Sequence, residues 1–255
     1  MDISLLGLLA AAAFGAGFID TIAGGGGLIT VPTLMLAQIP PVQALATNKL
    51  QASVGTLTST LAFWRKGHLR LTSIRKPFLY ALIGSAVGTL LIQRVKPAAL
   101  EILVPIVLGA IALYFLLAPG AGKVATAPRL SQRLYNRCVV PLIGFYDGFF
   151  GPGTGSFFSL AEVALRGHRL IQATANAKAL NLASNLASLV VFVAGGHVIW
   201  LVGATMLVAQ LAGAWLGSMV VMGAGARVIR PLIVVVSLAM LVRYAWQHGL
   251  FSWLV

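Results

Sequence analysis

The sequence predicts an all-α polytopic membrane protein with two inverted repeats, each a discontinuous, glycine-broken helix pair followed by three spanning helices. Of its 255 residues, 59% are hydrophobic and only 9% are charged, which is more apolar residue than a water-soluble core requires. The apolar stretches are long and continuous, whereas a transmembrane β-barrel would show short alternating segments. A glycine-rich passage also occurs twice, about half the chain apart. A duplicated helical bundle explains these observations together.

The repeated passage combines an acidic residue with a run of glycines. Asp20 precedes Gly24–Gly27, and Asp147 precedes Gly151-Pro152-Gly153-Thr154-Gly155. Each copy is followed by a polar stretch, which reads Thr47-Asn48-Lys49 in the first half and contains Thr174, Asn176 and Lys178 in the second. An acid and a lysine are costly in hydrocarbon and are usually functional there. The duplication therefore predicts a polar site near the middle of the membrane.

The helices follow from the apolar stretches. In the first half these run over residues 3–23, 28–37, 42–64, 72–92 and 98–117. In the second half they run over residues 134–150, 156–165, 170–194, 198–222 and 228–246. The second stretch of each half has about 10 residues and covers about 15 Å, roughly half of the hydrocarbon layer. We therefore expect it to be a half-helix that returns toward the side from which the first helix entered.

The domain boundaries and the orientation follow from this pattern. Residues 1–117 form the first repeat, 118–133 a cytoplasmic linker rich in proline, glycine and basic residues, and 134–255 the second repeat. Three spans after each returning unit give an odd number of crossings, so the second repeat should be upside-down relative to the first. Loop 65–76 is strongly basic but its counterpart 195–197 has no lysine or arginine, as the positive-inside bias predicts for inverted repeats with both termini in the periplasm.

The glycine runs have two interpretations. Glycine lets the backbone leave helical geometry and present bare N–H groups, and a half-helix that begins there directs its positive dipole end toward an anion. The alternative is close packing of small residues between spans, which suits the pair Gly84 and Gly88. We favour a binding or gating break for the consecutive glycines, namely Gly24, Gly25, Gly26, Gly27, Gly151, Gly153 and Gly155, with Thr154 between the last two.

The lysines and the two aspartates leave alternatives open. Ammonium, hydroxyl and amide donors make a recognition set for a small oxyanion; the candidate residues are Thr47, Asn48, Lys49, Gln51, Asn176, Lys178 and Asn181. The lysines could instead extend to the membrane interface or pair with Asp20 and Asp147. The aspartates could couple transport to protons or hold the glycine loops in shape.

Other residues narrow the class of protein. Glu162 has no acidic counterpart in the first half, where Met35 stands, so a structural or surface role is expected. The single cysteine, Cys138, excludes an intrachain disulfide framework and is expected to be buried. We expect no metal site and no cofactor, because the four histidines lie near span ends without ligand spacing. The net charge of +13 resides mainly in loops between apolar stretches, which favours a lipid bilayer over nucleic acid as the partner.

The chain resembles the sulfite exporter TauE/SafE family of bacterial inner-membrane permeases. The resemblance rests on Gly17 to Gly27, Asn48-Lys49-Leu50-Gln51, Gly144 to Gly155, and Asn176-Ala177-Lys178 leading to Asn181. It implies movement of sulfite, sulfonates or related anions across the cytoplasmic membrane by a secondary transporter, and the chain could form a homo-oligomer.

Three functional hypotheses follow. The first is a secondary anion transporter that works by alternating access around the two breaks, with proton coupling through Asp20 and Asp147 as an option. The second is an anion channel that uses the same site. The third, an intramembrane enzyme, is disfavoured because the chain has no His/Cys/acid ligand cluster and no Gly-x-Ser-x-Gly elbow. The absence of a phosphate-binding Gly-x-x-x-x-Gly-Lys-Ser/Thr loop argues against an ATP-driven pump.

Overall fold

The computed structural model describes residues 3–95 and 127–224, and all the regular secondary structure in these ranges is helical. The predicted spans 98–117 and 228–246, and the first part of the predicted linker, lie outside the described residues. The first half contributes α1 (Ile3–Ala23), α2 (Gly27–Leu36), α3 (Pro41–Arg65) and α4 (Leu71–Ile92). The second half contributes α6 (Gln132–Leu134), the π-helix η1 (Tyr135–Val139), α7 (Val140–Phe149), α8 (Thr154–Ala164), α9 (Leu170–Ala194) and α10 (Trp200–Ala224). Each predicted helix within the described ranges is present.

Three of the described helices are long and apolar enough to cross a membrane: Ile3–Ile22, Leu170–Ala194 and Trp200–Val220. The helices α3 and α4 have 25 and 22 residues and so also have spanning length. The outer face of α4 is apolar, with Leu79, Ile83, Val87 and Leu90 all more than half exposed. An apolar exterior is the arrangement expected in lipid. The described part of the chain is therefore consistent with a multi-pass helical membrane protein.

The sequence did not predict the π-helical turn η1. It lies directly before Pro141, which has no N–H to donate to the carbonyl of Arg137 four residues earlier, so the α-helical ladder is interrupted there. Cys138 lies on this turn and is exposed, so its predicted burial is wrong. A thiol is a weak hydrogen-bond donor on a small side chain, so its exposure buries no polar group and leaves little apolar surface uncovered.

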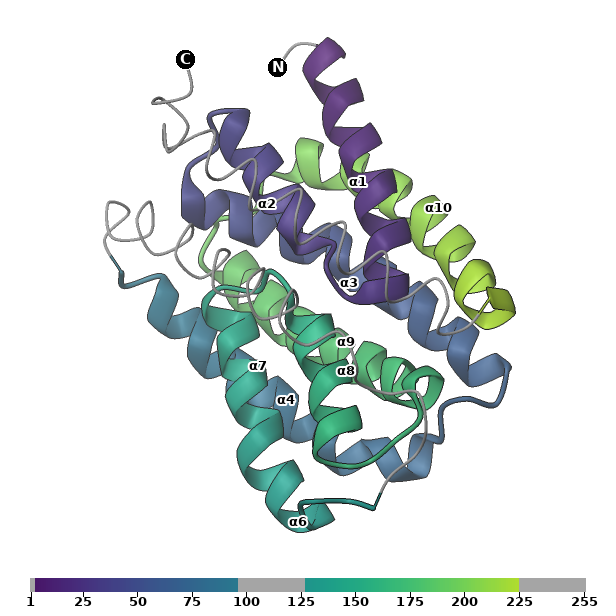
Figure 1. Cartoon of the computed structure of the whole chain (residues 1–255). Helices are drawn as coiled ribbons and strands as arrows, with labels where there is room; N and C mark the ends of the chain where they lie inside the picture. The colour runs from purple at the N-terminus through teal and green to yellow at the C-terminus, as the bar shows by residue number, and fades with distance from the viewer. Residues whose placement is uncertain (1–2, 96–126, 225–255) are drawn as a thin grey trace, which may run out of the picture.

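Pairs of helices from opposite halves pack along each other. In Figure 1, α1 lies beside α10 and α4 beside α7, and both pairs are in extensive contact. Glycines allow the backbones to approach: a Cβ on Gly84 would lie 2.1 Å from the Pro141 carbonyl oxygen, and one on Gly213 would lie 2.0 Å from that of Phe14. Gly84 and Gly88 match Gly213 and Gly217 at the same sequence offset. The small-residue packing expected at Gly84 and Gly88 is confirmed.

The two glycine breaks meet at the centre of the described structure. Gly24, Gly151 and Gly153 have φ values of +81°, +96° and +84°, a conformation that side-chain-bearing residues rarely adopt. A Cβ on Gly24 would lie 2.3 Å from the carbonyl carbon of Gly155 and from the backbone nitrogen of Ser156. Both the backbone conformation and the close contact therefore require glycine. The half-helices α2 and α8 start at this contact.

The helices α3 and α9 pack against each other and against elements of both halves. The buried faces of both helices are polar. The polar residues lower the mean hydropathy of α3 compared with the other long helices. The buried polar residues of α3 are Thr47, Asn48, Lys49, Gln51, Ser53, Thr56, Ser59 and Thr60. Those of α9 are Thr174, Asn176, Lys178, Asn181, Ser184, Asn185 and Ser188. The polar stripe predicted from the sequence is thus directed inward.

Candidate functional site

Two buried ion pairs connect the two halves of the protein. Lys49 Nζ on α3 lies 2.8 Å from Asp147 Oδ1 on α7, and Lys178 Nζ on α9 lies 2.9 Å from Asp20 Oδ2 on α1. The exposed fractions are 1% for Lys49, Lys178 and Asp147, and 7% for Asp20. Each lysine therefore pairs with the aspartate of the other half. Of the alternatives that the sequence left open, the structure has the lysine–aspartate pairing, and it excludes the interfacial position.

Because each lysine pairs with the aspartate of the other half, each ion pair connects the two halves. The aspartates come from the helices that precede the glycine breaks, and the lysines come from the central helices. A buried charge without its partner is strongly unfavourable: breaking such a pair costs about 3–5 kcal/mol. The two pairs therefore tie α1 to α9 and α7 to α3 close to the point where the breaks meet.

Asp20 holds the first glycine break in shape. Its Oδ1 accepts a hydrogen bond from the Gly26 N–H at 3.1 Å, and its Oδ2 accepts from Lys178. Its backbone carbonyl accepts from the Gly24 N–H at 2.7 Å and also from Lys178 Nζ. Every oxygen of Asp20 therefore has a partner, and the loop-orienting interpretation fits this residue.

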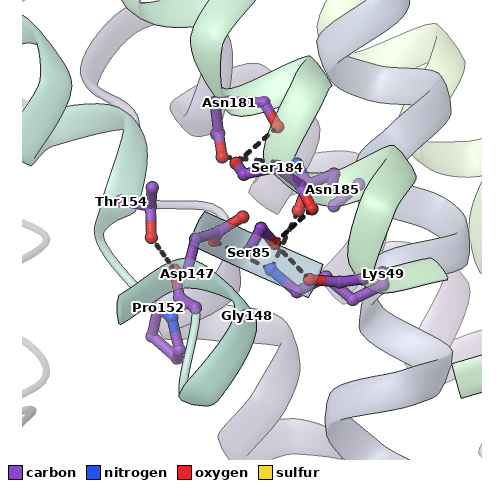
Figure 2. Close-up of polar contacts among 12 residues, drawn as sticks. Lys49, Ser85, Asp147, Gly148, Pro152, Thr154, Asn181, Ser184 and Asn185 are labelled. Atoms are coloured by element: carbon purple, nitrogen blue, oxygen red, sulfur yellow. Dashed lines mark hydrogen bonds and ion pairs between the residues drawn. The ribbon is translucent and has the colours of Figure 1, made fainter. Parts of the chain in front are cut away.

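Asp147 has a different environment, shown in Figure 2. Its Oδ1 contacts Lys49, but its Oδ2 is buried and has no hydrogen-bond partner. Lys49 Nζ also donates to Asn185 Oδ1 at 3.1 Å, and Asn185 Nδ2 donates to Asn181 Oδ1 at 3.4 Å. A Cβ on Gly151 would lie 3.0 Å from Lys49 Nζ. The second glycine break thus borders the ammonium group directly.

Several other predicted site residues also lie near the breaks. A Cβ on Gly155 would lie 3.3 Å from Asn181 Nδ2, and one on Gly27 would lie 3.6 Å from Asn48 Nδ2. The Thr154 hydroxyl donates to the Gly151 carbonyl at 2.7 Å and closes the second break. The breaks, the two ion pairs and these amides therefore form one buried polar centre.

Asn48 and Gln51 link the first half-helix to α3. Asn48 Oδ1 accepts hydrogen bonds from the Thr30 hydroxyl at 2.5 Å and from Gln51 Nε2 at 3.2 Å. The Gln51 carbonyl oxygen Oε1 is buried and has no hydrogen-bond partner. Of these two predicted binding residues, Gln51 thus has one acceptor atom without a hydrogen-bond partner.

Thr47 and Asn176, which occupy matching positions, take part in other contacts. The Thr47 hydroxyl oxygen accepts a hydrogen bond from the Ile199 N–H at 3.1 Å, directly before α10. Asn176 Nδ2 donates to Glu162 Oε2 at 2.9 Å, and that oxygen lies 2.5 Å from His168 Nδ1. Glu162 is buried, so its expected role is structural rather than that of a surface residue. The sequence did not predict this cluster, because its three members lie in α8, the next loop and α9.

Matching hydroxyl contacts lie beside the helix pairs α1–α10 and α4–α7, and the sequence did not predict them either. The Thr21 and Ser59 hydroxyls lie 2.7 Å apart between α1 and α3, and those of Ser85 and Ser188 lie 2.7 Å apart between α4 and α9. Ser59 and Ser188 share the sequence offset of the two lysines. In residues 3–95 and 127–224, no group of three or more His, Cys, Asp or Glu side chains could hold a metal ion.

Known proteins with similar sequences agree on the class of this protein. Residues 9–244 match the family described as Sulfite exporter TauE/SafE. A "Probable membrane transporter protein" of Haemophilus influenzae is 46% identical over 251 residues, which are 98% of each chain. The "Probable membrane transporter protein ORF9" of a Sinorhizobium species is 46% identical over 252 residues, 98% of this chain and 97% of the relative.

A third relative is the "Probable membrane transporter protein YfcA" of Escherichia coli K12. It is 45% identical over 253 residues, which are 98% of this chain and 94% of the relative. No solved structure matches the chain. The family match covers nearly the whole sequence, including both glycine breaks and both lysines. The chain therefore belongs to the sulfite exporter TauE/SafE family and is a membrane transporter, not an enzyme.

Proposed function

We propose that the protein is a secondary transporter that moves a small anion, such as sulfite or a sulfonate, across the bacterial cytoplasmic membrane by alternating access. The observation that carries this proposal is the pair of exchanged ion pairs beside the contact of the two glycine breaks. They put positive groups and bare backbone at one place between two matching halves. Such midplane sites between repeats are typical of secondary transporters.

The packing of the described helices supports inverted repeats. The first helix of each half lies along the last described helix of the other half, as α1 with α10 and α7 with α4. The contacting residues correspond as well: Gly17 faces the Gln210 carbonyl, and Gly144 faces the Ala81 carbonyl. Each of these four residues maps onto its counterpart at an offset of 127 or 129 residues. This arrangement is the one expected if a two-fold axis relates the described parts of the two halves.

The electrostatics of the centre support an anionic substrate. The helices α2 and α8 both start at the touching breaks, so the positive ends of two helix dipoles meet there. The amides of Asn181 and Asn185 add neutral polar groups next to Lys49. The family description names sulfite, and the oxygens of a small sulfur oxyanion accept hydrogen bonds from ammonium, amide and backbone N–H donors of the kind found here.

Flux measurements in proteoliposomes test the proposal. Sulfite, methanesulfonate and acetate are offered with and without a pH gradient, and protein-free vesicles provide the background. At least one anion should enter faster than the background, and unlabelled anion on the opposite side should accelerate that entry. A matched control is Gly7→Ala, at which an added Cβ meets nothing within 4 Å; it should transport normally.

The possible outcomes separate the hypotheses. Absence of flux for every anion would refute transport of small anions. Flux that unlabelled anion on the opposite side does not accelerate would indicate a channel. A channel has no binding site that must return across the membrane, so anion on the far side cannot speed entry.

A further inference from the structure

We propose that the two matched aspartates have different roles: Asp147 carries the proton that is coupled to anion movement, whereas Asp20 is a fixed structural group. This inference rests on the proposed function and deepens it. The sequence treats the two aspartates as equivalents, because each stands four residues before a glycine break. The difference between them exists only in their contacts.

The first observation is the number of partners of each carboxylate. Asp20 uses both oxygens, one for the Gly26 N–H and one for Lys178. Asp147 uses Oδ1 for Lys49, while its buried Oδ2 has no hydrogen-bond partner. Buried polar atoms almost always have a partner, so an exception calls for an explanation. A carboxylate oxygen that is free of protein donors can accept a proton without displacing any contact.

The second observation concerns the lysines. Lys178 donates to both the carboxylate and the backbone carbonyl of Asp20. Lys49 donates to one carboxylate oxygen and to the neutral Asn185 side chain. If Asp147 becomes neutral at Oδ2, Lys49 loses the negative charge of its carboxylate partner but keeps Asn185 and remains beside the Gly151 backbone. The ammonium group is then available to neutralise an anion.

Charge neutrality links the two binding events. In the empty site, Lys49 and Asp147 neutralise each other. A hydronium ion transfers its proton to Asp147 Oδ2, so one of its O–H bonds breaks, an O–H bond forms on the carboxyl group and water leaves; a monovalent anion then supplies the negative charge beside Lys49. The loaded site is again neutral, whereas a proton alone or an anion alone would leave a net charge buried away from water, which is unfavourable. Proton and anion therefore bind and leave together, and the movement of a monovalent anion carries no net charge.

The groups around Asp147 are compatible with this role. Next to Asp147, the Gly148 backbone packs against Ser85 and Thr89 of α4, which do not titrate. Its neighbour Tyr146 donates its hydroxyl proton to the Pro152 carbonyl at 2.6 Å. The nearest other charged or titratable residues on the adjacent elements are Lys49 on α3, Lys178 on α9 with its partner Asp20 on α1, and Tyr80 on α4. Glu162, near the end of α8, is paired with His168.

The test compares the wild type with Asp147→Asn and Asp20→Asn in proteoliposomes. Methanesulfonate is the main probe because its single charge does not change with pH, and sulfite is the second probe. Wild-type accumulation should follow an imposed pH gradient and ignore a clamped membrane potential. Asp147→Asn should lose the response to the pH gradient by at least tenfold and should respond to the potential, since its empty site keeps the charge of Lys49. Asp20→Asn should lower the yield of folded protein, and the folded fraction should keep the pH response.

A second measurement does not depend on a mutant that folds. Binding of methanesulfonate to the detergent-solubilised wild type in weak buffer should take up about one proton per anion. Three results would each overturn the assignment. They are wild-type flux that follows the membrane potential alone, anion binding without proton uptake, and flux through Asp147→Asn that still follows the pH gradient. Loss of coupling in Asp20→Asn but not in Asp147→Asn would reverse it. Absence of anion flux in the wild type would instead refute the proposed function, and this inference with it.

Discussion

Lys178 and Asp20 show how much one buried charge depends on its partner. Both side chains are almost fully removed from solvent, and they are separated by 158 residues in the sequence. In such an environment the pair as a whole contributes little net stability, but either charge alone is strongly unfavourable. The effect of a substitution therefore depends on whether its partner is still charged.

A double-mutant cycle tests this dependence. Lys178→Met and Asp20→Asn should each lower the free energy of unfolding by about 3–5 kcal/mol, because each leaves a charge or a donor without its partner. The double variant should lose clearly less than the sum of the two, since no buried charge remains. Thermal or denaturant unfolding in detergent provides the measurement. Strictly additive losses would mean that the two groups do not interact.

At the level of the elements, close contact between helices depends on a few glycines. Gly17 on α1 is buried, and a Cβ there would lie 2.5 Å from the Gln210 carbonyl oxygen. Gly15 lies two residues earlier on the same helix, and an added Cβ would meet nothing within 4 Å. The two glycines therefore lie on the same helix, two residues apart, but differ in how closely other atoms pack against them.

Substitution of these two glycines should have opposite effects. Gly17→Ala should destabilise the protein by about 1–3 kcal/mol, because α1 and α10 must separate to admit the methyl group. Gly15→Ala should be neutral or stabilising by up to about 1 kcal/mol, since alanine is the better helix former. The melting temperatures of the two purified variants decide the matter. Equal effects would contradict the proposed packing of α1 on α10.

The second half-helix is held by contacts that the first half lacks. Glu162 on α8 contacts His168 in the following loop and Asn176 on α9, whereas Met35 stands at its matching position. Because the His168 side chain is about one-quarter exposed, solvent screens part of its attraction to the carboxylate. These contacts thus stabilise the end of α8, and Met35 cannot form the same hydrogen bonds at the end of α2.

Removal of His168 should therefore loosen this region locally. We expect His168→Ala to increase backbone hydrogen exchange in residues 165–169 and at the end of α8, with a loss of roughly 1 kcal/mol in local stability. Exchange around residues 37–40, the matching loop of the first half, should not change and serves as the internal control. Unchanged exchange in residues 165–169 would show that the cluster does not hold α8.

For the whole molecule, orientation is the property on which the transport proposal depends. The C-terminal residue of α3, Arg65, and the C-terminal residue of α9, Ala194, correspond to each other and are both exposed. In an inverted pair, corresponding residues lie on opposite sides of the membrane. In a parallel repeat they would lie on the same side.

Labelling of single cysteines tests the inversion. In a Cys138→Ser background, which removes the exposed native thiol, Arg65→Cys should react with membrane-impermeant reagents only from the cytoplasm. Ala194→Cys should react only from the periplasm. The measurement is the fraction labelled in intact cells and in inverted vesicles. Labelling of both residues from the same side would exclude inverted repeats and the alternating-access mechanism built on them.

The predictions from sequence succeeded where local signals are sufficient. Within the described ranges, the helix bounds agree within about two residues, since apolar runs, proline and glycine act over short distances. The polar stripe of α3 and α9 was also recognisable, because buried polar residues recur at helical spacing. The Glu162 cluster and the exposure of Cys138 were not predicted, since each depends on what packs beside the segment. The π-helical turn was not predicted either, although its cause, Pro141, is local.

By itself, the sequence determined the class of the protein, the order of its helices, its two glycine breaks and the residues of its polar centre. Hydrophobic patterning and glycine conformation are local properties, so they can be read along the chain. Only the tertiary structure decided that each lysine binds the aspartate of the other half, and that Asp147 keeps an oxygen without a partner. Those facts depend on contacts between residues about 100 to 160 positions apart, and no local pattern selects among several matched partners of equal charge.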